Sequence, residues 1–360
     1  MKRISILLLV FCTCLALVAW PQTKPQGWEH KIITFDAPGA GTGAGQGTFG
    51  QNLNDLGAIA GWYVDSSYGL HGIVWSPFGN IAEFDAPDAS YGTYAVNPND
   101  AGATEGFYFD SNGMGHGFVR DPFGNITEFD APNASGGTFP EWINFGGAIS
   151  GFWNDSNGMG HGFVRAADGT ITEFDPPKAG GEGTVGSGMN SWGAITGFYH
   201  TSDQVLHGFV RNPDGTFQVF DAPDANKVAH QGTYGFSIND AGAVTGYYPD
   251  RNGVWHGFVR NPKGHITEFS VPGAGNGNGQ GTFSWGINGA GAITGYWIDS
   301  NNVTHGFVRD PDGKITEFDA PGAGTGAGQG TTPGFINYFG AISGYYVDSN
   351  NVAHGFLRVP

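Results

Sequence analysis

Short segments in which apolar and polar residues alternate recur along the chain, and they predict β-strands. In residues 281–288, for example, Phe283, Trp285 and Ile287 alternate with small or polar residues. A period of two places the apolar side chains on one face of a pleated strand. Beyond residue 30 the sequence shows no sustained helical period. The pattern therefore predicts an all-β fold.

One unit of the pattern contains four strand segments joined by short turns. The segments of a representative unit are residues 281–288, 291–297, 305–309 and 314–319. The last two are joined by Asp310-Pro-Asp-Gly313, a typical hairpin-turn sequence. Consecutive short turns predict a four-stranded antiparallel sheet. The connection to the next unit, residues 320–329, is longer and rich in glycine, so it suits a crossover between sheets.

The third segment carries a near-copy of His-Gly-Phe-Val-Arg in every unit. The copies start at His71, His116, His161, His207, His256, His305 and His354, 45 to 49 residues apart. Periods of this length are typical of arrays and propellers, in which each unit buries its apolar faces against its neighbours. A propeller blade is a four-stranded sheet of this kind.

The ends of the repeated region decide between an open array and a ring. The region begins with a lone fourth segment, residues 31–36, and ends with three segments that finish at residues 354–358. A ring pairs the first strand with the last three and removes the open sheet edge. The sequence therefore predicts that residues 31–360 form a single domain, a seven-bladed β-propeller of four-stranded blades with three-plus-one closure.

The repeats also resemble a known family. His71-Gly-Ile-Val-Trp75, and the Asn-x-x-Gly-Ala-Ile-x-Gly pattern that precedes it in the repeat, are similar to the HAF-type repeats of bacterial extracellular proteins, whose signature is His-Ala-Phe-Leu-Trp. The resemblance covers residues 31–360, although Gly replaces Ala and Arg usually replaces Trp. It implies export and repetition, and it implies no established activity.

The first residues have the features of a secretory leader. Lys2 and Arg3 precede an apolar run, so residues 1–20 are predicted to be a signal peptide, and residues 21–30 a flexible start to the exported protein. We expect a secreted, periplasmic or extracellular location. Both cysteines, Cys12 and Cys14, fall in the leader, and so no disulfide is expected to stabilise the fold.

The composition restricts the classes of partner that the protein is expected to bind. The formal net charge is −17, which argues against nucleic acid and against an anionic membrane surface. The 64 glycines and 14% aromatic residues fit tightly turning β-structure. We expect a monomer that binds a glycan or a protein and has no membrane contact once the leader is removed.

Each repeated histidine is predicted to face an aspartate across a hairpin, fourteen residues further along the chain. The predicted pairs are His71/Asp85, His116/Asp130, His161/Asp175, His207/Asp221 and His305/Asp319, with His354/Asp36 across the chain ends. The remaining copy has Ser270 in place of the aspartate. Such pairs occur in general-base and metal sites. Because the feature recurs in six of seven units, a structural cross-strand hydrogen bond is the favoured interpretation.

No cofactor motif stands out. Turns such as Asp110-Ser-Asn-Gly and Asp299-Ser-Asn-Asn carry oxygen ligands at alternate positions, which leaves calcium open, although hairpin turns select the same residues. The glycine-rich run 39–45 lacks the Lys-Ser/Thr of a phosphate loop. The sequence also lacks a Gly-x-Ser-x-Gly elbow and a His-Glu-x-x-His motif. No metal site is predicted.

The candidate ligand-binding residues lie on the crossover face, the face that carries the glycine-rich crossovers and the turns between second and third strands. Chain direction places the residue before each first strand at the rim of the axial channel. The predicted rim consists of Gln46, Tyr91, Glu182, Gln231, Gln280 and Gln329, together with the unrepeated Glu141 and Trp142. Other unrepeated residues of this face are His200, Asp203, Lys227 and His230. The alternative is that the glutamine amides cap backbone groups at a crowded position.

Three functions remain open. The similarity between repeats favours an exported, non-enzymatic binding or scaffold propeller that recognises a glycan or protein through the crossover face. The first alternative is a polysaccharide-active lyase or hydrolase that uses an unrepeated acid/base set drawn from Glu141, Glu182, His200 or His230. The second is a purely structural surface protein. No catalytic residue is identified by a motif.

Overall fold

The protein is built entirely from β-strands in the part that the structure describes. The computed structural model describes residues 31–360, which contain 28 strands and no helix. The all-β prediction is thus confirmed. The expected leader, residues 1–20, and the segment 21–30 lie outside the described residues. Between residues 31 and 360, no helix is present that could span a membrane.

The strands recur in a fixed order of four. The first strands of the sheets are β2 (Gly47–Leu53), β6 (Thr93–Pro98), β10 (Gly137–Ile143), β14 (Thr184–Met189), β18 (Tyr234–Ile238), β22 (Gly281–Ile287) and β26 (Gly330–Ile336). The second strands are β3 (Ile59–Val64), β7 (Thr104–Phe109), β11 (Ile149–Asn154), β15 (Ile195–His200), β19 (Val244–Pro249), β23 (Ile293–Ile298) and β27 (Ile342–Val347).

The third strands carry the His-Gly-Phe-Val-Arg copies, and the fourth strands are the shortest. The third strands are β4 (Leu70–Trp75), β8 (Gly115–Arg120), β12 (Gly160–Arg165), β16 (Leu206–Arg211), β20 (Trp255–Arg260), β24 (Thr304–Arg309) and β28 (Ala353–Arg358). The fourth strands are β1 (Ile32–Phe35), β5 (Ile81–Phe84), β9 (Ile126–Phe129), β13 (Ile171–Phe174), β17 (Phe217–Phe220), β21 (Ile266–Phe269) and β25 (Ile315–Phe318).

Within each sheet the strands form an antiparallel meander in chain order. In the β22–β25 sheet, Thr294 pairs with Gly286 on one side and Val308 on the other. Strand β23 starts two residues later than expected, because Gly291 adopts a φ of 86° inside the turn. Every first strand contains a register shift, for example between Ser284 and Gly286, which bends the strand.

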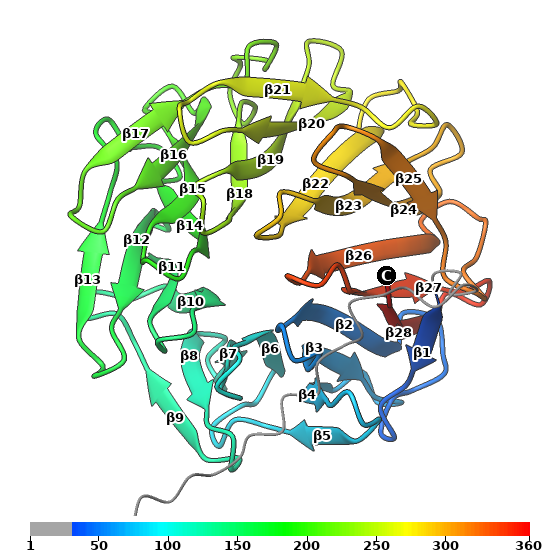
Figure 1. Cartoon of the computed structure of the whole chain (residues 1–360). Helices are drawn as coiled ribbons and strands as arrows, with labels where there is room; N and C mark the ends of the chain where they lie inside the picture. The colour runs from blue at the N-terminus through cyan, green and yellow to red at the C-terminus, as the bar shows by residue number, and fades with distance from the viewer. Residues whose placement is uncertain (1–30) are drawn as a thin grey trace, which may run out of the picture.

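The sheets are arranged around a central axis, with the first strands innermost and the fourth strands at the periphery (Figure 1). The earliest described strand, β1, pairs antiparallel with the last strand, β28, from Ile32 opposite Arg358 to Phe35 opposite Gly355. Parallel bridges join third strands to the next first strand, as between Thr304 and Gly330. The start of each such first strand therefore lies beside the neighbouring sheet's third strand.

The repeated motif supplies both the core and the contact between sheets. Its phenylalanine is fully buried in six copies, and Ile73 takes that place in the first copy. Its arginine lies over the phenylalanine of the preceding sheet's fourth strand, as Arg309 does over Phe269 at 5.0 Å. In the first copy Trp75 instead stacks on Phe35 of β1 at 5.1 Å. Each sheet is thus held to the one before it by an aromatic contact.

Asparagines form a second set of contacts near the axis, in the turns that follow the first strands. Asn54 donates its side-chain amide to the carbonyl of Asn99, and Asn99 donates to that of Asn144. The same link recurs from Asn190 through Asn239 and Asn288 to Asn337. Asn337 then donates to the carbonyl of Asn54 at 3.2 Å, which joins the last turn to the first.

Candidate functional site

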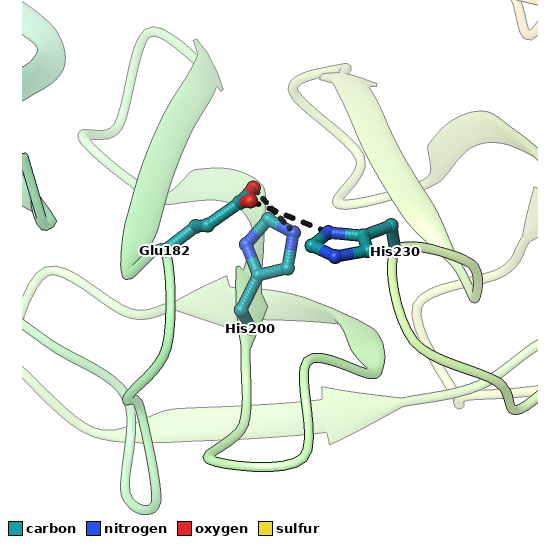
Figure 2. A group of neighbouring side chains, drawn as sticks. All are labelled: Glu182, His200 and His230. Atoms are coloured by element: carbon teal, nitrogen blue, oxygen red, sulfur yellow. Dashed lines mark ion pairs between the residues drawn. The ribbon is translucent and has the colours of Figure 1, made fainter.

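Three unrepeated residues converge on the crossover face. Glu182 lies in the connection between β13 and β14, His200 is the last residue of β15, and His230 lies in the connection between β17 and β18 (Figure 2). The Glu182 carboxylate is 3.3 Å from Nε2 of His200 and 3.3 Å from Nδ1 of His230. One ligand-type atom from each residue lies within 4.8 Å of the other two. We call this group the Glu182–His200–His230 cluster.

The backbone of three chain segments positions the cluster. The N–H of His200 donates to the carbonyl of Gly183, directly after Glu182, at 2.8 Å. The N–H of His230 donates to the carbonyl of Gln204, in the turn that follows β15, at 2.8 Å. Two crossovers are therefore attached to the same second strand and its turn. Because these bonds are made by the main chain, they fix the backbone of the three segments whatever the protonation state of the imidazoles.

Burial differs sharply within the cluster. His200 is buried, whereas the side chains of Glu182 and His230 are more than half exposed. Burial lowers the pKa of His200, and the negative charge of Glu182 opposes this shift in part. A neutral imidazole keeps a lone pair available as a base or a metal ligand. The exposed side of the cluster is open to a ligand.

All three positions depart from the repeat. Glu182 occupies the position at which four other repeats have glutamine, namely Gln46, Gln231, Gln280 and Gln329. His200 ends its second strand where aliphatic residues such as Val64 and Ile298 end theirs. His230 has a φ of 61° at a position where three other repeats have a glycine of positive φ, namely Gly45, Gly279 and Gly328. A non-glycine residue in this conformation is uncommon and strained.

Three of the predicted rim glutamines directly precede the first strands of their sheets. The arrowheads of β22 and β26 point toward the middle of the molecule, so these strands begin away from the axis (Figure 1). Gln280 and Gln329 precede these strands and lie next to the parallel bridges that join Trp255 with Gly281 and Thr304 with Gly330. Gln46 precedes β2 and is buried. The residue after it, Gly47, forms the equivalent parallel bridge with Ala353 of β28. The common axial rim remains a prediction, since chain direction does not reveal strand tilt.

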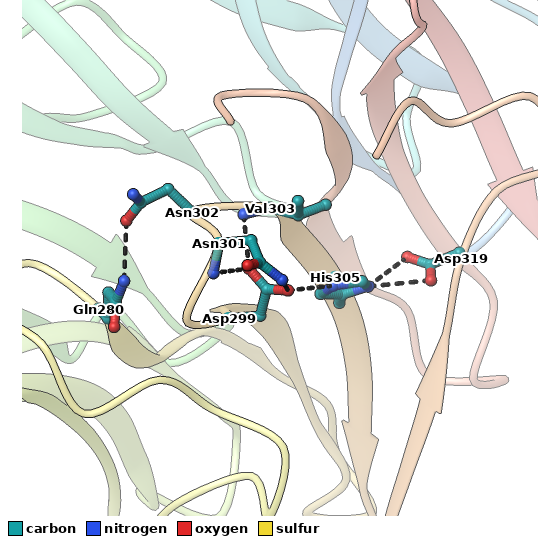
Figure 3. Close-up of polar contacts among 7 residues, drawn as sticks. All are labelled: Gln280, Asp299, Asn301, Asn302, Val303, His305 and Asp319. Carbon is teal, nitrogen blue, oxygen red and sulfur yellow. Dashed lines mark hydrogen bonds and ion pairs between the residues drawn. The ribbon is translucent and has the colours of Figure 1, made fainter. Parts of the chain in front are cut away.

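These glutamines brace the crossovers. Oε1 of Gln280 accepts the N–H of Gly277 at 2.9 Å, and its amide group donates to Oδ1 of Asn302 at 3.0 Å (Figure 3). Gln329 makes the equivalent bonds to Gly326 and Asn351. Gln46 accepts from Gly43 at 2.8 Å. These contacts are of the kind expected from the alternative interpretation, in which the glutamine amides cap local backbone groups.

Two further members of the predicted rim lie in other crossovers. Oε1 of Gln231 accepts a hydrogen bond from the side-chain amide of Asn226. Tyr91 is 62% exposed, in the connection that precedes β6. Of the predicted rim residues, Glu182 alone belongs to the Glu182–His200–His230 cluster.

Glu141 and Trp142 lie elsewhere, in strand β10. Trp142 lines a cavity of about 180 Å³ at the ends of the first strands, away from the crossovers, and its ring lies 4.7 Å from that of Phe335 in β26. Glu141 is half-buried, and burial raises its pKa to about 8. Its neighbour Glu105 in β7 is fully buried, and neither of its carboxylate oxygens has a hydrogen-bond partner within residues 31–360. These residues do not share a site with Glu182.

Glu105 was missed by sequence reasoning, although a signal exists. It occupies the second position of β7, where β15, β19 and β23 have threonine. In β15 that threonine, Thr196, donates its hydroxyl to the carbonyl of Phe209 at 2.9 Å. The other repeats carry an apolar or hydroxyl-bearing residue at this position, so a glutamate there can be recognised in the sequence as unrepeated.

Each repeated histidine contacts the partner expected from the fourteen-residue offset. Nδ1 of the histidine lies 2.7 to 3.0 Å from a carboxylate oxygen in the six pairs His71/Asp85, His116/Asp130, His161/Asp175, His207/Asp221, His305/Asp319 and His354/Asp36. Nδ1 of His256 lies 2.8 Å from the hydroxyl of Ser270. His305 also stacks on Trp297 at 4.3 Å and has Asp299 on its other side at 3.9 Å (Figure 3).

The aspartates of these pairs lie outside the strands in which they were expected. Asp36, Asp85 and Asp175 each follow the last residue of a fourth strand, and all three are exposed. The predicted strand 31–36 therefore ends one residue early. The reason is that the chain already turns toward the next sheet: the N–H after Asp36 donates to the hydroxyl of Thr48, and Asp175 itself accepts the hydroxyl of Thr184 at 2.6 Å. The pairs are contacts at the solvent-exposed margin of each sheet and not ladder positions within it.

The turn aspartates are occupied by their own turns. Oδ1 of Asp299 accepts the N–H groups of Asn301 and Val303 at 2.8 Å, and Oδ2 accepts from the Asn301 amide. Asp110 makes the same set of bonds with Asn112 and Met114. These bonds account for the Asp-Ser-Asn pattern as turn geometry, without a bound calcium ion.

Comparison with known proteins bears on the fold. No family model matches the chain, and no curated protein matches it. Among solved structures it is similar to a catalytically inactive histidine-to-alanine variant of virginiamycin B lyase from Staphylococcus aureus with quinupristin, at 16% identity over 92% of this chain and 100% of that chain, with a TM-score of 0.58. A streptogramin B lyase structure matches at 17% identity over 92% and 98% of the two chains, with a TM-score of 0.56. At these identities the similarity establishes the architecture and not the activity: the chain has an all-β, propeller-type fold made of repeated four-stranded sheets.

Proposed function

We propose that the repeated sheets are the blades of a seven-bladed propeller with three-plus-one closure. The antiparallel pairing of β1 with β28 supports this proposal. The contact of Trp75 with Phe35 and the bond from Asn337 to Asn54 support it independently, because each repeats between the chain ends an interaction found between consecutive sheets. A closed ring leaves no sheet edge open to aggregation.

We further propose that the protein is an exported binding propeller that recognises a glycan or protein ligand through the Glu182–His200–His230 cluster. The observation that carries this proposal is the break in symmetry. In all seven repeats a histidine contacts a hydroxyl or carboxylate group that follows the fourth strand. At one place only, within the described residues, two crossovers and the end of β15 bring two additional histidines to a shared, exposed carboxylate. A single ligand needs one asymmetric site on an otherwise repetitive scaffold.

The site has the chemistry for recognition. The exposed carboxylate accepts hydrogen bonds from hydroxyl or amide groups, and the imidazoles act as donors or acceptors. Tyr234 adds an aromatic ring, since its hydroxyl lies 3.4 Å from the carbonyl of His230. Carboxylates beside aromatic rings suit neutral sugars and peptides.

A ligand screen tests this proposal. The wild-type protein is screened on glycan and peptide arrays, and each hit is measured again with Glu182→Gln. The substituted residue is the one found at this position in four other repeats, so the fold is expected to persist. We expect binding to weaken in this variant and to remain unchanged in Asp319→Asn, which alters a repeated partner. A hit that responds to Asp319→Asn and ignores Glu182→Gln would place the site elsewhere.

An enzymatic role is the second candidate, and one observation favours it. A carboxylate held between two imidazoles is a suitable acid/base set, and the buried His200 has a pKa lowered by desolvation. The similar virginiamycin B lyase is described as catalytically inactive when one of its histidines is replaced by alanine. Incubation of the protein with a panel of polysaccharides and cyclic peptides, compared with Glu182→Gln, separates a lyase or hydrolase from a binding protein.

A further inference from the structure

The spacing within the Glu182–His200–His230 cluster differs from that of the repeated histidines. Nδ1 of the six repeated histidines approaches aspartate to 2.7–3.0 Å, which is direct hydrogen-bond contact. Both nitrogen–oxygen separations in the cluster are 3.3 Å. Nitrogen and oxygen ligands at 2.0–2.2 Å from a tetrahedral zinc ion lie about 3.3–3.5 Å from each other. The two contacts are made by different oxygens of Glu182, Oε2 to His200 and Oε1 to His230, and one ligand-type atom of each residue lies within 4.8 Å of the other two, which is close enough for the three residues to share one metal ion.

We infer that the Glu182–His200–His230 cluster binds one divalent transition-metal ion of the Zn²⁺ class, through the Glu182 carboxylate, Nε2 of His200 and Nδ1 of His230. Three protein ligands leave a coordination position for a ligand on the exposed side. Two imidazoles and one carboxylate favour zinc, cobalt, nickel or copper over calcium and magnesium, which select oxygen ligands. The inference extends the proposed function. It rests on that function only for the role of the open coordination position.

The backbone conformation of His230 agrees with this inference. His230 has a φ of 61°, at a position where three other repeats use glycine. A side chain in this left-handed conformation costs about 1–2 kcal/mol. The φ of 61° accompanies an Nδ1 atom that lies 3.3 Å from the Glu182 carboxylate. A metal bond would compensate this strain at His230, although the described residues also include other non-glycine residues with positive φ, such as Tyr68 and Gln204.

Glu182 and His200 also differ from the residues at the equivalent positions of other repeats. The glutamines at the position of Glu182 brace their own crossovers, as Gln280 does through Gly277 and Asn302. Glu182 instead directs its carboxylate to the two histidines (Figure 2). His200 introduces a buried imidazole at a position where none of the other six second strands ends in histidine, and where Val64, Ile298 and Val347 end three of them. Three separate departures from the repeat therefore meet at one point and supply the donor set of a zinc site.

The test uses the repeat's own residues as replacements. Untagged full-length protein is treated with a chelator, and Zn²⁺ alone is titrated by calorimetry, while Co²⁺ is titrated by visible absorption. We expect one saturable site per chain and intense Co²⁺ absorption bands typical of tetrahedral geometry. Glu182→Gln and His230→Gly should each weaken Zn²⁺ binding at least about tenfold, because each removes one of three ligands.

His230→Gly also separates a metal ligand from a structural residue. Because glycine relieves the strain at positive φ, this variant should unfold at the same or a higher temperature without metal, while its stabilisation by Zn²⁺ is lost. Asp319→Asn is the matched control at a repeated His/Asp pair and should leave the Zn²⁺ titration unchanged. His200→Val is a third variant, read only if its circular dichroism matches that of the wild type.

Several results would overturn the inference. These are no saturable Zn²⁺ binding, wild-type affinity in both Glu182→Gln and His230→Gly, equal binding of Ca²⁺, or loss of Zn²⁺ binding in Asp319→Asn. A failure of the proposed function can be distinguished from a failure of the metal inference. A ligand hit that persists in chelator would reject the metal while supporting the binding site. Saturable Zn²⁺ binding without any glycan, peptide or turnover hit would support the metal and reject the proposed recognition.

Discussion

At the scale of single residues, the repeat tolerates different side chains when they make the same contact. The fifth position of the motif is Arg309 in one copy and Trp75 in another, and each covers a phenylalanine of the preceding sheet. A guanidinium and an indole can both stack on an aromatic face. The sequence shows this variation but not its reason, because the partner phenylalanine lies in a different repeat.

Glu105 and Glu141 are residues whose burial conflicts with their charge. Burial raises the pKa of Glu105 well above its usual range, and the charge of Glu141 adds to this shift. Burial also raises the pKa of Glu141 from 4.5 to about 8. In the unfolded chain both carboxyls ionise at lower pH. The folded state therefore loses stability as pH rises from about 4.5 towards 8.

Removing one of these charges should stabilise the protein at neutral pH. We expect Glu105→Thr, which restores the residue of three other sheets, to raise the free energy of unfolding at pH 7.5 by about 1–3 kcal/mol. Glu141→Gln should flatten the decline in stability between pH 4.5 and 8. Urea unfolding at several pH values measures both effects. The exposed Glu317→Gln is the control, and an equal gain in that variant would contradict the explanation by burial.

At the scale of strands and hairpins, sequence periodicity was informative because the relevant contacts are local. Hairpin turns and alternation predicted the four strands of a unit, and the fourteen-residue offset predicted the contact of His305 with Asp319. The tilt of the first strands is not local, since it depends on the parallel bridge to the previous sheet. For that reason the assignment of Gln280 and Gln329 to an axial rim remains a prediction.

The repeated pair should contribute to stability and not to ligand binding. Asp130→Ala removes the partner that lies 2.9 Å from Nδ1 of His116, and we expect a loss of up to about 1 kcal/mol because the pair is partly exposed. Ser270→Asp, which introduces the carboxylate missing beside His256, should leave stability unchanged or raise it slightly. Thermal unfolding measures both variants. A larger loss together with lost ligand binding would assign the pair a functional role.

The turns between second and third strands should respond to acid and not to calcium. Backbone N–H groups, first among them that of Gly69, hold the pKa of Asp65 below its usual range, and the N–H of Met114 does the same for Asp110. A carboxyl with a lowered folded pKa stabilises the fold above its unfolded pKa of about 4, and this contribution is lost as pH falls. We expect the unfolding temperature to decrease below about pH 4 and to be unchanged by millimolar Ca²⁺ or by a calcium chelator. A rise with Ca²⁺ would show that the turns bind it.

At the scale of the whole molecule, the candidate site arises from the meeting of distant segments. Glu182, His200 and His230 could each be recognised in the sequence as unrepeated, but their contact depends on two crossovers that share one second strand. Trp142 shows the same limit, because its partner Phe335 comes from a strand far along the chain. Sequence patterns identify departures from a repeat, and the ring geometry determines which departures meet.

The final prediction follows from the proposed closure of the ring. Deleting residues 27–36 removes β1, which exposes the edge of β28, leaves Trp75 without Phe35 and leaves His354 without Asp36. We expect a less cooperative unfolding transition, a lower unfolding temperature and concentration-dependent aggregation, because an unpaired edge strand pairs with other chains. Deleting residues 21–26 instead is the control, since it retains every described strand. Unfolding followed by circular dichroism and light scattering compares the two. If both deletions behave like the full chain, the pairing of β1 with β28 does not close the fold, and the sheets would have to be stable as an open array.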